Sequence, residues 1–229
     1  MNIRDALEPI RTLKHRIFGS SGSVPLRYFA KFLPDDPVIL EAGAYNGGDT
    51  REIALRWPRG HVHAFEPVPE LLALVKQQAA GLKNISCYDV ALGPEDGSAE
   101  FYVSGGASDA SSSLLRPSGH LDEHPDVSFE RTLHVKVRSI DSWAAENNVS
   151  KVDFMWIDMQ GAEMAALKGA KKILPTVKVI YTEVSLKPLY ETGPLYPEFR
   201  EWLDAQGFKV AREALASEDC GNVVFVRES

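Results

Sequence analysis

Short apolar runs alternate with helical segments along most of the chain, and this alternation limits the fold more than any other sequence feature. The runs are bounded by glycine, proline or polar turn residues, as strands buried on both faces are. The predicted strands are Val38–Ala42, His61–Phe65, Ile85–Val90, Val152–Ile157 and Val177–Val184, and the predicted helices are Asp49–Arg56, Glu70–Ala80 and Ala162–Leu174. Strands separated by helices predict an α/β fold with a Rossmann-like, doubly wound and mostly parallel sheet.

The end of the chain departs from this rhythm. A helical segment, Phe199–Ala205, ends at Gly207 and is followed by two extended runs, Phe208–Arg212 and Asn222–Val226. The link between these two runs is too short to hold a helix that crosses over the sheet. We therefore expect an antiparallel hairpin at the carboxyl end of the sheet.

The first 37 residues read as a helical extension that precedes a main domain of residues 38–229. Ile3, Leu7, Ile10, Leu13 and Ile17 recur at helical spacing, and a second, short helix is expected at Leu26–Phe32. This extension is expected to cap the core. Covering a substrate or packing on a second subunit of a homodimer are the alternatives.

The stretch from Gly93 to Ile140 is the least regular part of the chain. Strand-like segments at Ala99–Val103 and Leu133–Val137 frame glycine, serine and histidine clusters. Long irregular segments in compact domains are usually functional. We predict an insertion that lies over the active site or orders when a ligand binds.

Charge and composition narrow the set of partners. The formal net charge of −7 argues against nucleic acid, because binding a phosphate backbone needs a basic face. Neither an apolar run of the ~20 residues that span a bilayer nor a secretory signal stands out. Cys87 and Cys220 lack metal-ligand spacing and are expected to be free thiols. We expect a cytoplasmic protein without a membrane partner.

A glycine-rich turn follows the first predicted strand and opens the first helix. The dinucleotide fingerprint G-x-G-x-x-G has its second glycine where Tyr45 stands, and a pyrophosphate packs against that glycine. Glu41 would repel a pyrophosphate, whereas it could attract the cationic amino group of S-adenosylmethionine (SAM). The residues expected to contact SAM here are Glu41, Gly43, Ala44, Tyr45, Asn46, Gly47 and Thr50.

Two further strand ends supply candidate cofactor contacts. Glu66 ends the second predicted strand, directly before Pro67, where a carboxylate can accept hydrogen bonds from both ribose hydroxyls. Asp89, Val90 and Ala91 close the third strand and are expected to flank the adenine. Asp89 could accept from the adenine amino group or be a solvated strand end.

Five motifs together resemble the FkbM family of SAM-dependent methyltransferases. In chain order they are Glu41–Thr50, Glu66–Pro67, Ala91–Gly93, Ser111–Leu114 and Asp158–Glu163. The resemblance covers residues 38–226 and implies a class I methyltransferase. It also implies that the reaction is O-methylation of a natural product or a sugar. Two departures stand out: Glu41 and Tyr45 replace the usual Asp and Asn of the first turn, and Gln160 replaces the first Glu of Asp-x-Glu-Gly-x-Glu.

Two carboxylates are candidates for catalysis, and one of them, Asp158, is also expected to contact SAM. Asp158 ends the strand Val152–Ile157, and Glu183 ends the next strand, so both should open onto one cleft. Either could act as the general base for a hydroxyl acceptor. The pair could instead hold a divalent cation, an option that the charge lost at Gln160 weakens. Glu163 reads better as a partner of the helix dipole.

The irregular stretch adds weaker candidates. His120, His124 and His134 are interpreted as solvated loop histidines, with a role as base the alternative. Ser112, within the serine cluster, is expected to reach SAM from a closing loop.

The predicted function is methylation of a small-molecule hydroxyl. An amine or protein acceptor, an NAD-dependent oxidoreductase and a non-catalytic SAM-binding module remain alternatives.

Overall fold

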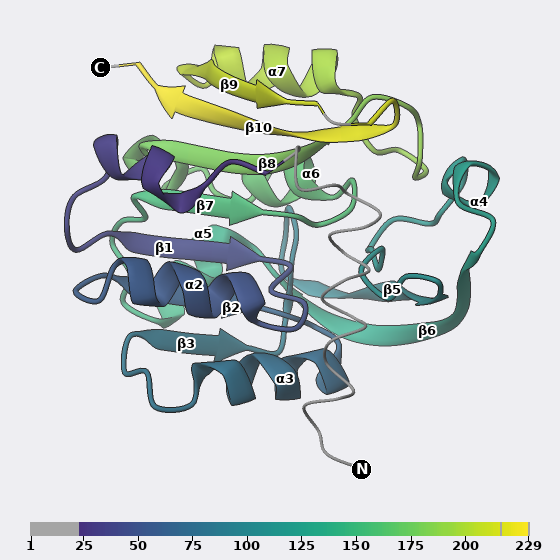
Figure 1. Ribbon diagram of the computed structural model, residues 1–229, viewed down its shortest axis with the longest axis horizontal. Helices are drawn as coiled ribbons and strands as arrows, with labels where there is room; N and C mark the ends of the chain where they lie inside the picture. Colours follow the sequence, from purple (N-terminus) through teal and green to yellow (C-terminus); the bar gives the residue numbers. More distant parts are fainter. Residues whose placement is uncertain (1–22, 216, 229) are drawn as a thin grey trace.

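A seven-stranded sheet forms the centre of the protein (Figure 1). The computed structural model describes residues 23–215 and 217–228. The strand order is β3-β2-β1-β7-β8-β10-β9, and only β10 runs antiparallel to its neighbours. The strands are β1 Val38–Ala42, β2 His61–Phe65, β3 Ile85–Tyr88, β7 Phe154–Ile157, β8 Val179–Ser185, β9 Phe208–Ala214 and β10 Cys220–Arg227. This arrangement confirms the predicted α/β fold and its antiparallel carboxyl-terminal hairpin.

Helices cover both faces of the sheet because alternate strand residues point to opposite sides. In β1, Ile39 packs in a cluster with residues of α2, whereas Leu40 packs in a cluster with residues of α5, α6 and α7. In Figure 1, α2 and α3 lie in front of the sheet, with α5 and α6 behind it. The helices are α2 Gly48–Arg56, α3 Pro69–Ala79, α5 Ile140–Glu146, α6 Glu163–Lys168 and α7 Tyr196–Ala205.

The strand order places a topological switch point between β1 and β7. From β1 the chain moves outward to β2 and β3, then returns to the other side of β1 to form β7 and β8. At such a point the two connections diverge and leave a crevice at the carboxyl ends of the strands, where ligands of doubly wound folds bind.

A second, three-stranded sheet fills the predicted insertion, with the order β4-β6-β5. It consists of β4 Ala91–Leu92, β5 Gly97–Gly106 and β6 Val127–Arg138, with the short helix α4 His120–Glu123 in the connection. The third predicted strand, Ile85–Val90, is shorter than expected and ends at Tyr88. The chain leaves the main sheet there, because Ala91 pairs with Val137 of β6.

Two helices also differ from their predicted extent. The helix expected over Ala162–Leu174 ends at Lys168, and a 3-10 turn, η2 Leu174–Thr176, follows. A side chain at Gly169 would lie 2.4 Å from the carbonyl oxygen of Gly93, so the insertion packs closely on the chain at this point.

The short helix expected at Leu26–Phe32 is a 3-10 helix, η1 Leu26–Lys31. Its Phe29 is fully buried, with its ring 4.9 Å from that of Phe154. This contact makes the described part of the extension a cover for one face of the sheet. The predicted helix over residues 3–17 lies outside the described residues. Within the described part of the chain, no helix has the length and apolar character needed to cross a membrane.

Candidate active site

One pocket opens at the carboxyl ends of β1, β2 and β7, beneath the insertion. Its volume is about 600 Å³, which includes solvent at its mouth. The predicted site residues that line it are Gly43, Tyr45, Glu66, Pro67, Val90, Ala91, Ser112 and Asp158. The pocket therefore brings together residues from all five sequence motifs.

Gly43 lies where the turn after β1 packs against the end of β7. Its φ of +82° lies in the left-handed region, and a Cβ there would lie 1.9 Å from the carbonyl oxygen of Asp158. Gly47 is similar, because a Cβ would lie 2.7 Å from the Cα of Val75 in α3. The sequence predicts that both glycines contact SAM. At both positions the space is taken by another segment of the chain, and of the two only Gly43 lines the pocket.

Glu66 is held rigidly at the end of β2. Its Oε2 accepts a hydrogen bond from the backbone N–H of Tyr45 at 2.9 Å, and its Oε1 accepts one from the N–H of Val68 at 2.9 Å. The side chain is buried but faces the pocket. These two bonds to different backbone N–H groups fix the orientation of the carboxylate.

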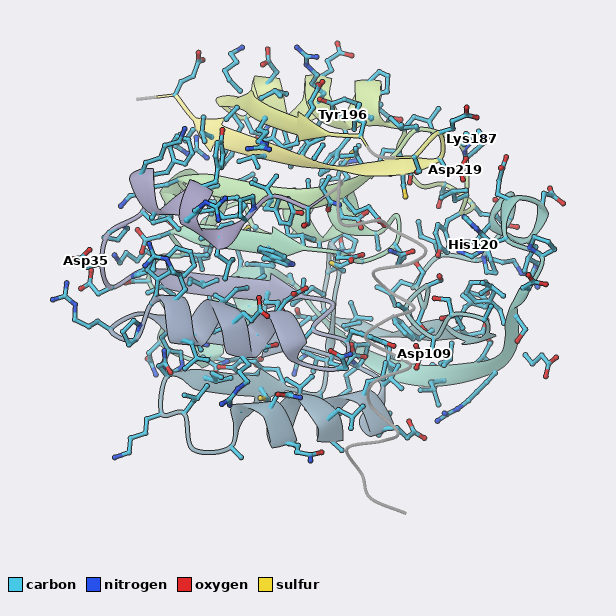
Figure 2. The ribbon with its side chains drawn as sticks, viewed as in Figure 1. Asp35, Asp109, His120, Lys187, Tyr196 and Asp219 are labelled. Atoms are coloured by element: carbon cyan, nitrogen blue, oxygen red, sulfur yellow. The ribbon has the colours of Figure 1, made fainter. Side chains whose placement is uncertain are left out.

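Tyr45 links the first turn to the insertion. Its hydroxyl donates a short hydrogen bond to the carboxylate of Asp109, which also lines the pocket. Burial and then this hydrogen bond raise the pKa of Tyr45 well above its usual value, so the hydroxyl remains protonated. Figure 2 labels Asp109 in the insertion, near β5 and β6. Asp109 carries no sequence signal that distinguishes it from other acids in irregular segments.

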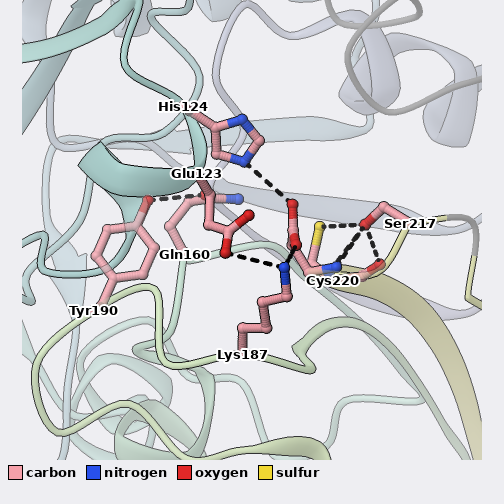
Figure 3. Close-up of polar contacts among 8 residues, drawn as sticks. Glu123, His124, Gln160, Lys187, Tyr190, Ser217 and Cys220 are labelled. Carbon is pink, nitrogen blue, oxygen red and sulfur yellow. Dashed lines mark hydrogen bonds and ion pairs between the residues drawn. The ribbon is translucent and has the colours of Figure 1, made fainter.

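Gln160 connects two carboxylates at the other end of the pocket. Its Nε2 lies 2.8 Å from Oδ1 of Asp158 and 2.6 Å from Oε2 of Glu183. The hydroxyl of Tyr190 lies 3.1 Å from Oε1 of Gln160 (Figure 3). Asp158 and Gln160 line the pocket, whereas Glu183 is connected to it through Gln160.

Glu163 supports the loop that carries this end of the pocket. It lies in the first turn of α6, and its Oε1 accepts from the backbone N–H of Met159 at 2.8 Å and of Gly161 at 3.3 Å. Burial raises the pKa of Glu163 to about 7. It is outside the pocket lining, so its place is consistent with the structural role expected from the sequence.

The interpretation of His120 as a solvated loop residue is wrong. The side chain is buried, and its ring centroid lies 5.5 Å from that of Tyr190. Burial lowers the pKa of His120 to about 4. His124 is partly exposed and lies 3.7 Å from Asp219, while His134 is bonded to Ser98 on the exposed surface. All three histidines are absent from the lining of the described pocket.

The remaining predicted contacts fall outside the pocket lining formed by residues 23–215 and 217–228. They are Glu41, Ala44, Asn46, Gly47, Thr50, Asp89 and Glu183. Glu41 and Thr50 are buried, Asn46 accepts from the backbone N–H of Gly48, and Asp89 is exposed beyond the end of β3. Asp89 misses the pocket because the chain turns toward the second sheet after Tyr88.

Several pocket residues were missed because they come from helix α3, from the insertion or from short strands. They are chiefly Leu71, Leu92, Phe101, Asp109, Ala110 and Leu114. Gln160 also lines the pocket, although the sequence marks it only as a departure from the family pattern. The apolar members form a wall suited to a flat, mostly apolar group such as adenine.

The described residues do not offer a metal centre. Among them, no group of three or more histidine, cysteine, aspartate or glutamate side chains is placed to hold an ion. The point that faces both Asp158 and Glu183 is taken by Nε2 of Gln160, which donates hydrogen bonds and is not a metal ligand. The residues at this end therefore fit a hydrogen-bonded site.

Residues 41–210, most of the chain, match the Methyltransferase FkbM domain. The chain belongs to the FkbM family of SAM-dependent methyltransferases. The 2-O-methyltransferase NoeI of Sinorhizobium fredii is 34% identical over 161 residues, which are 68% of this chain and 66% of NoeI. Methyltransferase 1 of Beauveria bassiana is 26% identical over 147 residues, 59% of each chain. The chain thus spans two thirds or less of the length of these relatives.

Solved structures share the fold of this FkbM protein. The Methanococcus jannaschii fibrillarin pre-rRNA processing protein superposes with a TM-score of 0.51 at 19% identity, over 85% of this chain and 68% of that one. Sp1610 of Streptococcus pneumoniae, a putative tRNA (m1A22) methyltransferase, gives 0.50 at 15% identity, over 90% and 72%. At these identities the likeness concerns the fold alone.

Proposed function

We propose that this FkbM protein transfers the methyl group of SAM to a hydroxyl oxygen of a small molecule. The observation that carries the proposal is one pocket with a fixed carboxylate at each end, Glu66 after β2 and Asp158 after β7. SAM, when bound, supplies an electrophilic methyl group on a sulfonium and leaves as S-adenosylhomocysteine once the acceptor oxygen has bonded to that methyl carbon.

The cofactor would lie at the Glu66 end. Glu66 is oriented by two backbone N–H groups and can accept hydrogen bonds from both ribose hydroxyls. Val90, Leu92 and Phe101 supply an apolar wall for the adenine. Tyr45 occupies the place of the second glycine of a dinucleotide fingerprint, which supports SAM over NAD.

Asp158 is the proposed general base. It lies at the carboxyl end of β7 and borders the pocket beside Gly43. Its carboxylate would accept the proton of the acceptor hydroxyl as the oxygen attacks the methyl carbon. A positioned base contributes roughly 10²- to 10⁴-fold to such a step. Alignment of the oxygen with the methyl group supplies much of the remaining acceleration.

A hydroxyl acceptor is supported by the likeness to NoeI, whose name describes a 2-O-methyltransferase. The polar groups at this end, the Asp158 carboxylate and the Gln160 amide, suit a hydroxylated acceptor better than an apolar one. Sugars and hydroxylated natural products are the first acceptors to test.

The first experiment is calorimetric titration with SAM, followed by transfer of a labelled methyl group to a panel of sugars, phenols and amines. We expect SAM to bind and an O-methylated product to form. The Asp158→Asn variant should keep its SAM affinity within about threefold and lose 10²- to 10⁴-fold in transfer rate. The exposed Asp122→Asn variant is the matched control. Absence of SAM binding at millimolar ligand, or N-methylated products alone, would contradict the proposal.

A further inference from the structure

The amide of Gln160 is oriented by its neighbours. An amide nitrogen carries two hydrogens, and here one faces Asp158 and the other Glu183, at 2.8 and 2.6 Å. The opposite orientation would turn the amide oxygen toward two carboxylate oxygens and be repelled. Oε1 instead faces the hydroxyl of Tyr190 (Figure 3). That hydroxyl also lies 2.8 Å from the carbonyl oxygen of Ser111.

Gln160 and Tyr190 are buried in this arrangement, whereas Asp158 and Glu183 are half-buried. Gln160 is 7% exposed and Tyr190 is 4% exposed. Burial, followed by the negative charges of Glu183 and Asp158, raises the pKa of Tyr190 well above its usual value. The thiol of Cys220 has a raised pKa for the same reasons, burial first and then the charge of Glu183. Negative charge is therefore concentrated on two sides of a buried amide, and Gln160 is the donor placed between Asp158 and Glu183.

A carboxylate in place of this amide would change the chemistry of the site. Three carboxylate groups would then meet where the protein now has two carboxylates and a double donor. Like charges this close cannot all remain ionised without compensation, so a proton or a cation must join them. Three carboxylates around one point also form the kind of oxygen site that binds hard divalent cations.

We propose that Gln160 is a positioning residue that holds Asp158 and Glu183 together as a hydrogen-bonded pair, so that the base works without a divalent cation. This inference rests on the proposed function, because it assigns Asp158 to the acceptor. Gln160 acts through Asp158 and Glu183. It determines how the acceptor end of the pocket carries its charge.

The test is the binding of Mn²⁺ to the full chain, measured by titration calorimetry and by electron paramagnetic resonance, without an acceptor. We expect the Q160E variant to bind one Mn²⁺ at least tenfold more tightly than the wild type does. The Q77E variant is the matched control, because it adds the same charge at an exposed glutamine of α3. Q77E should leave Mn²⁺ binding at the wild-type level.

A second variant guards against misfolding of Q160E. Q160M removes the double donor and keeps a side chain of similar length, so the two carboxylates face each other unbridged. We expect its Mn²⁺ affinity to rise at least threefold, and the pH profile of SAM-dependent methyl transfer to shift relative to the wild type. A residue that only filled space at position 160 would move neither quantity.

Two results would overturn the inference. In one, Mn²⁺ binds the wild type as tightly as it binds Q160E. In the other, neither Q160E nor Q160M binds Mn²⁺ more tightly than the wild type. SAM titration of each variant separates this question from the proposed function. Failure of the wild-type protein to bind SAM would contradict the proposed function. The Mn²⁺ comparison would still test whether Gln160 holds Asp158 and Glu183 together.

Discussion

The two carboxylates at the ends of the pocket are held in different ways. Glu66 is fixed by backbone N–H groups of Tyr45 and Val68, which belong to the turns after β1 and β2. Asp158 is bonded to the side chain of Gln160, which reaches Glu183 and Tyr190 on other segments. Backbone donors are present whatever the side chains are, whereas a side-chain network changes with every substitution. The contacts of Glu66, at the proposed cofactor end, thus depend on the fold, and those of Asp158, at the proposed acceptor end, depend on particular side chains.

The largest effect is expected at Gly43, where the turn after β1 packs against the backbone of Asp158. Gly43→Ala places a Cβ 1.9 Å from the carbonyl oxygen of Asp158, at a φ of +82°. We expect a loss of about 3–5 kcal/mol in the free energy of unfolding, measured by urea denaturation. Gly81→Ala is the matched control, because its φ is +83° and nothing lies within 4 Å. It should lose only about 1 kcal/mol. Equal losses of unfolding free energy in the two variants would show that the close contact between Gly43 and Asp158 does not matter for stability.

Glu163, which supports the loop at the proposed acceptor end, should make the free energy of unfolding depend on pH. Burial raises the pKa of Glu163 from its usual value of 4.5 to about 7, so the unfolded chain releases the proton first as pH rises. The contribution of Glu163 to the free energy of unfolding is therefore fully present below about pH 4.5. It is lost as the pH rises through 7, a decrease on the order of 3 kcal/mol. Glu163→Gln should lack this part of the decline when unfolding is measured at pH 4 and pH 8. Glu95→Gln, on the surface, should decline as the wild type does. A Glu163→Gln curve parallel to that of the wild type would refute the assignment.

Glu66 tests the cofactor end. Glu66→Ala removes the acceptor of two backbone N–H groups and the proposed partner of the ribose hydroxyls. We expect SAM affinity to fall about 100-fold, or about 2.7 kcal/mol, in calorimetric titration. The control is Glu70→Ala, whose side chain is 63% exposed. SAM binding at wild-type strength in Glu66→Ala would place the cofactor elsewhere.

The smallest effect is expected at the contact between the first turn and the insertion. Tyr45→Phe keeps the ring and removes the hydroxyl that donates to Asp109. The rate of SAM dissociation, measured by stopped-flow fluorescence, should rise about fivefold, as expected for the loss of about 1 kcal/mol. Tyr102→Phe removes a hydroxyl outside the pocket and should leave the rate unchanged. An unchanged rate in Tyr45→Phe would mean that the insertion does not retain the cofactor.

Local sequence patterns predicted the main sheet well because they act over a few residues. The strands Val38–Ala42 and His61–Phe65 have the bounds expected from their apolar runs and turn residues. The strand expected to reach Val90 stops at Tyr88, because pairing of Ala91 with β6 draws the chain away. The apolar pattern through Val90 gives no sign of this partner, which lies far along the sequence.

The candidate site divides in the same way. Glu66 and Asp158 could be predicted because each follows a parallel strand, and such strands end at one edge of the sheet. Asp109 could not, because its contact with Tyr45 spans 64 residues and depends on how the insertion closes over the pocket. At Gln160 the sequence shows only that a negative charge of the family motif is missing. It does not show which side chains the amide contacts.

By itself, then, the amino-acid sequence determined the doubly wound sheet, its family and the two strand-end carboxylates. Periodicity, turn chemistry and strand direction are local, and they suffice for these features. Only the tertiary structure decided what surrounds each carboxylate: backbone N–H groups at Glu66, and at Asp158 an amide that also reaches Glu183. Those surroundings depend on segments that meet only when the chain has folded.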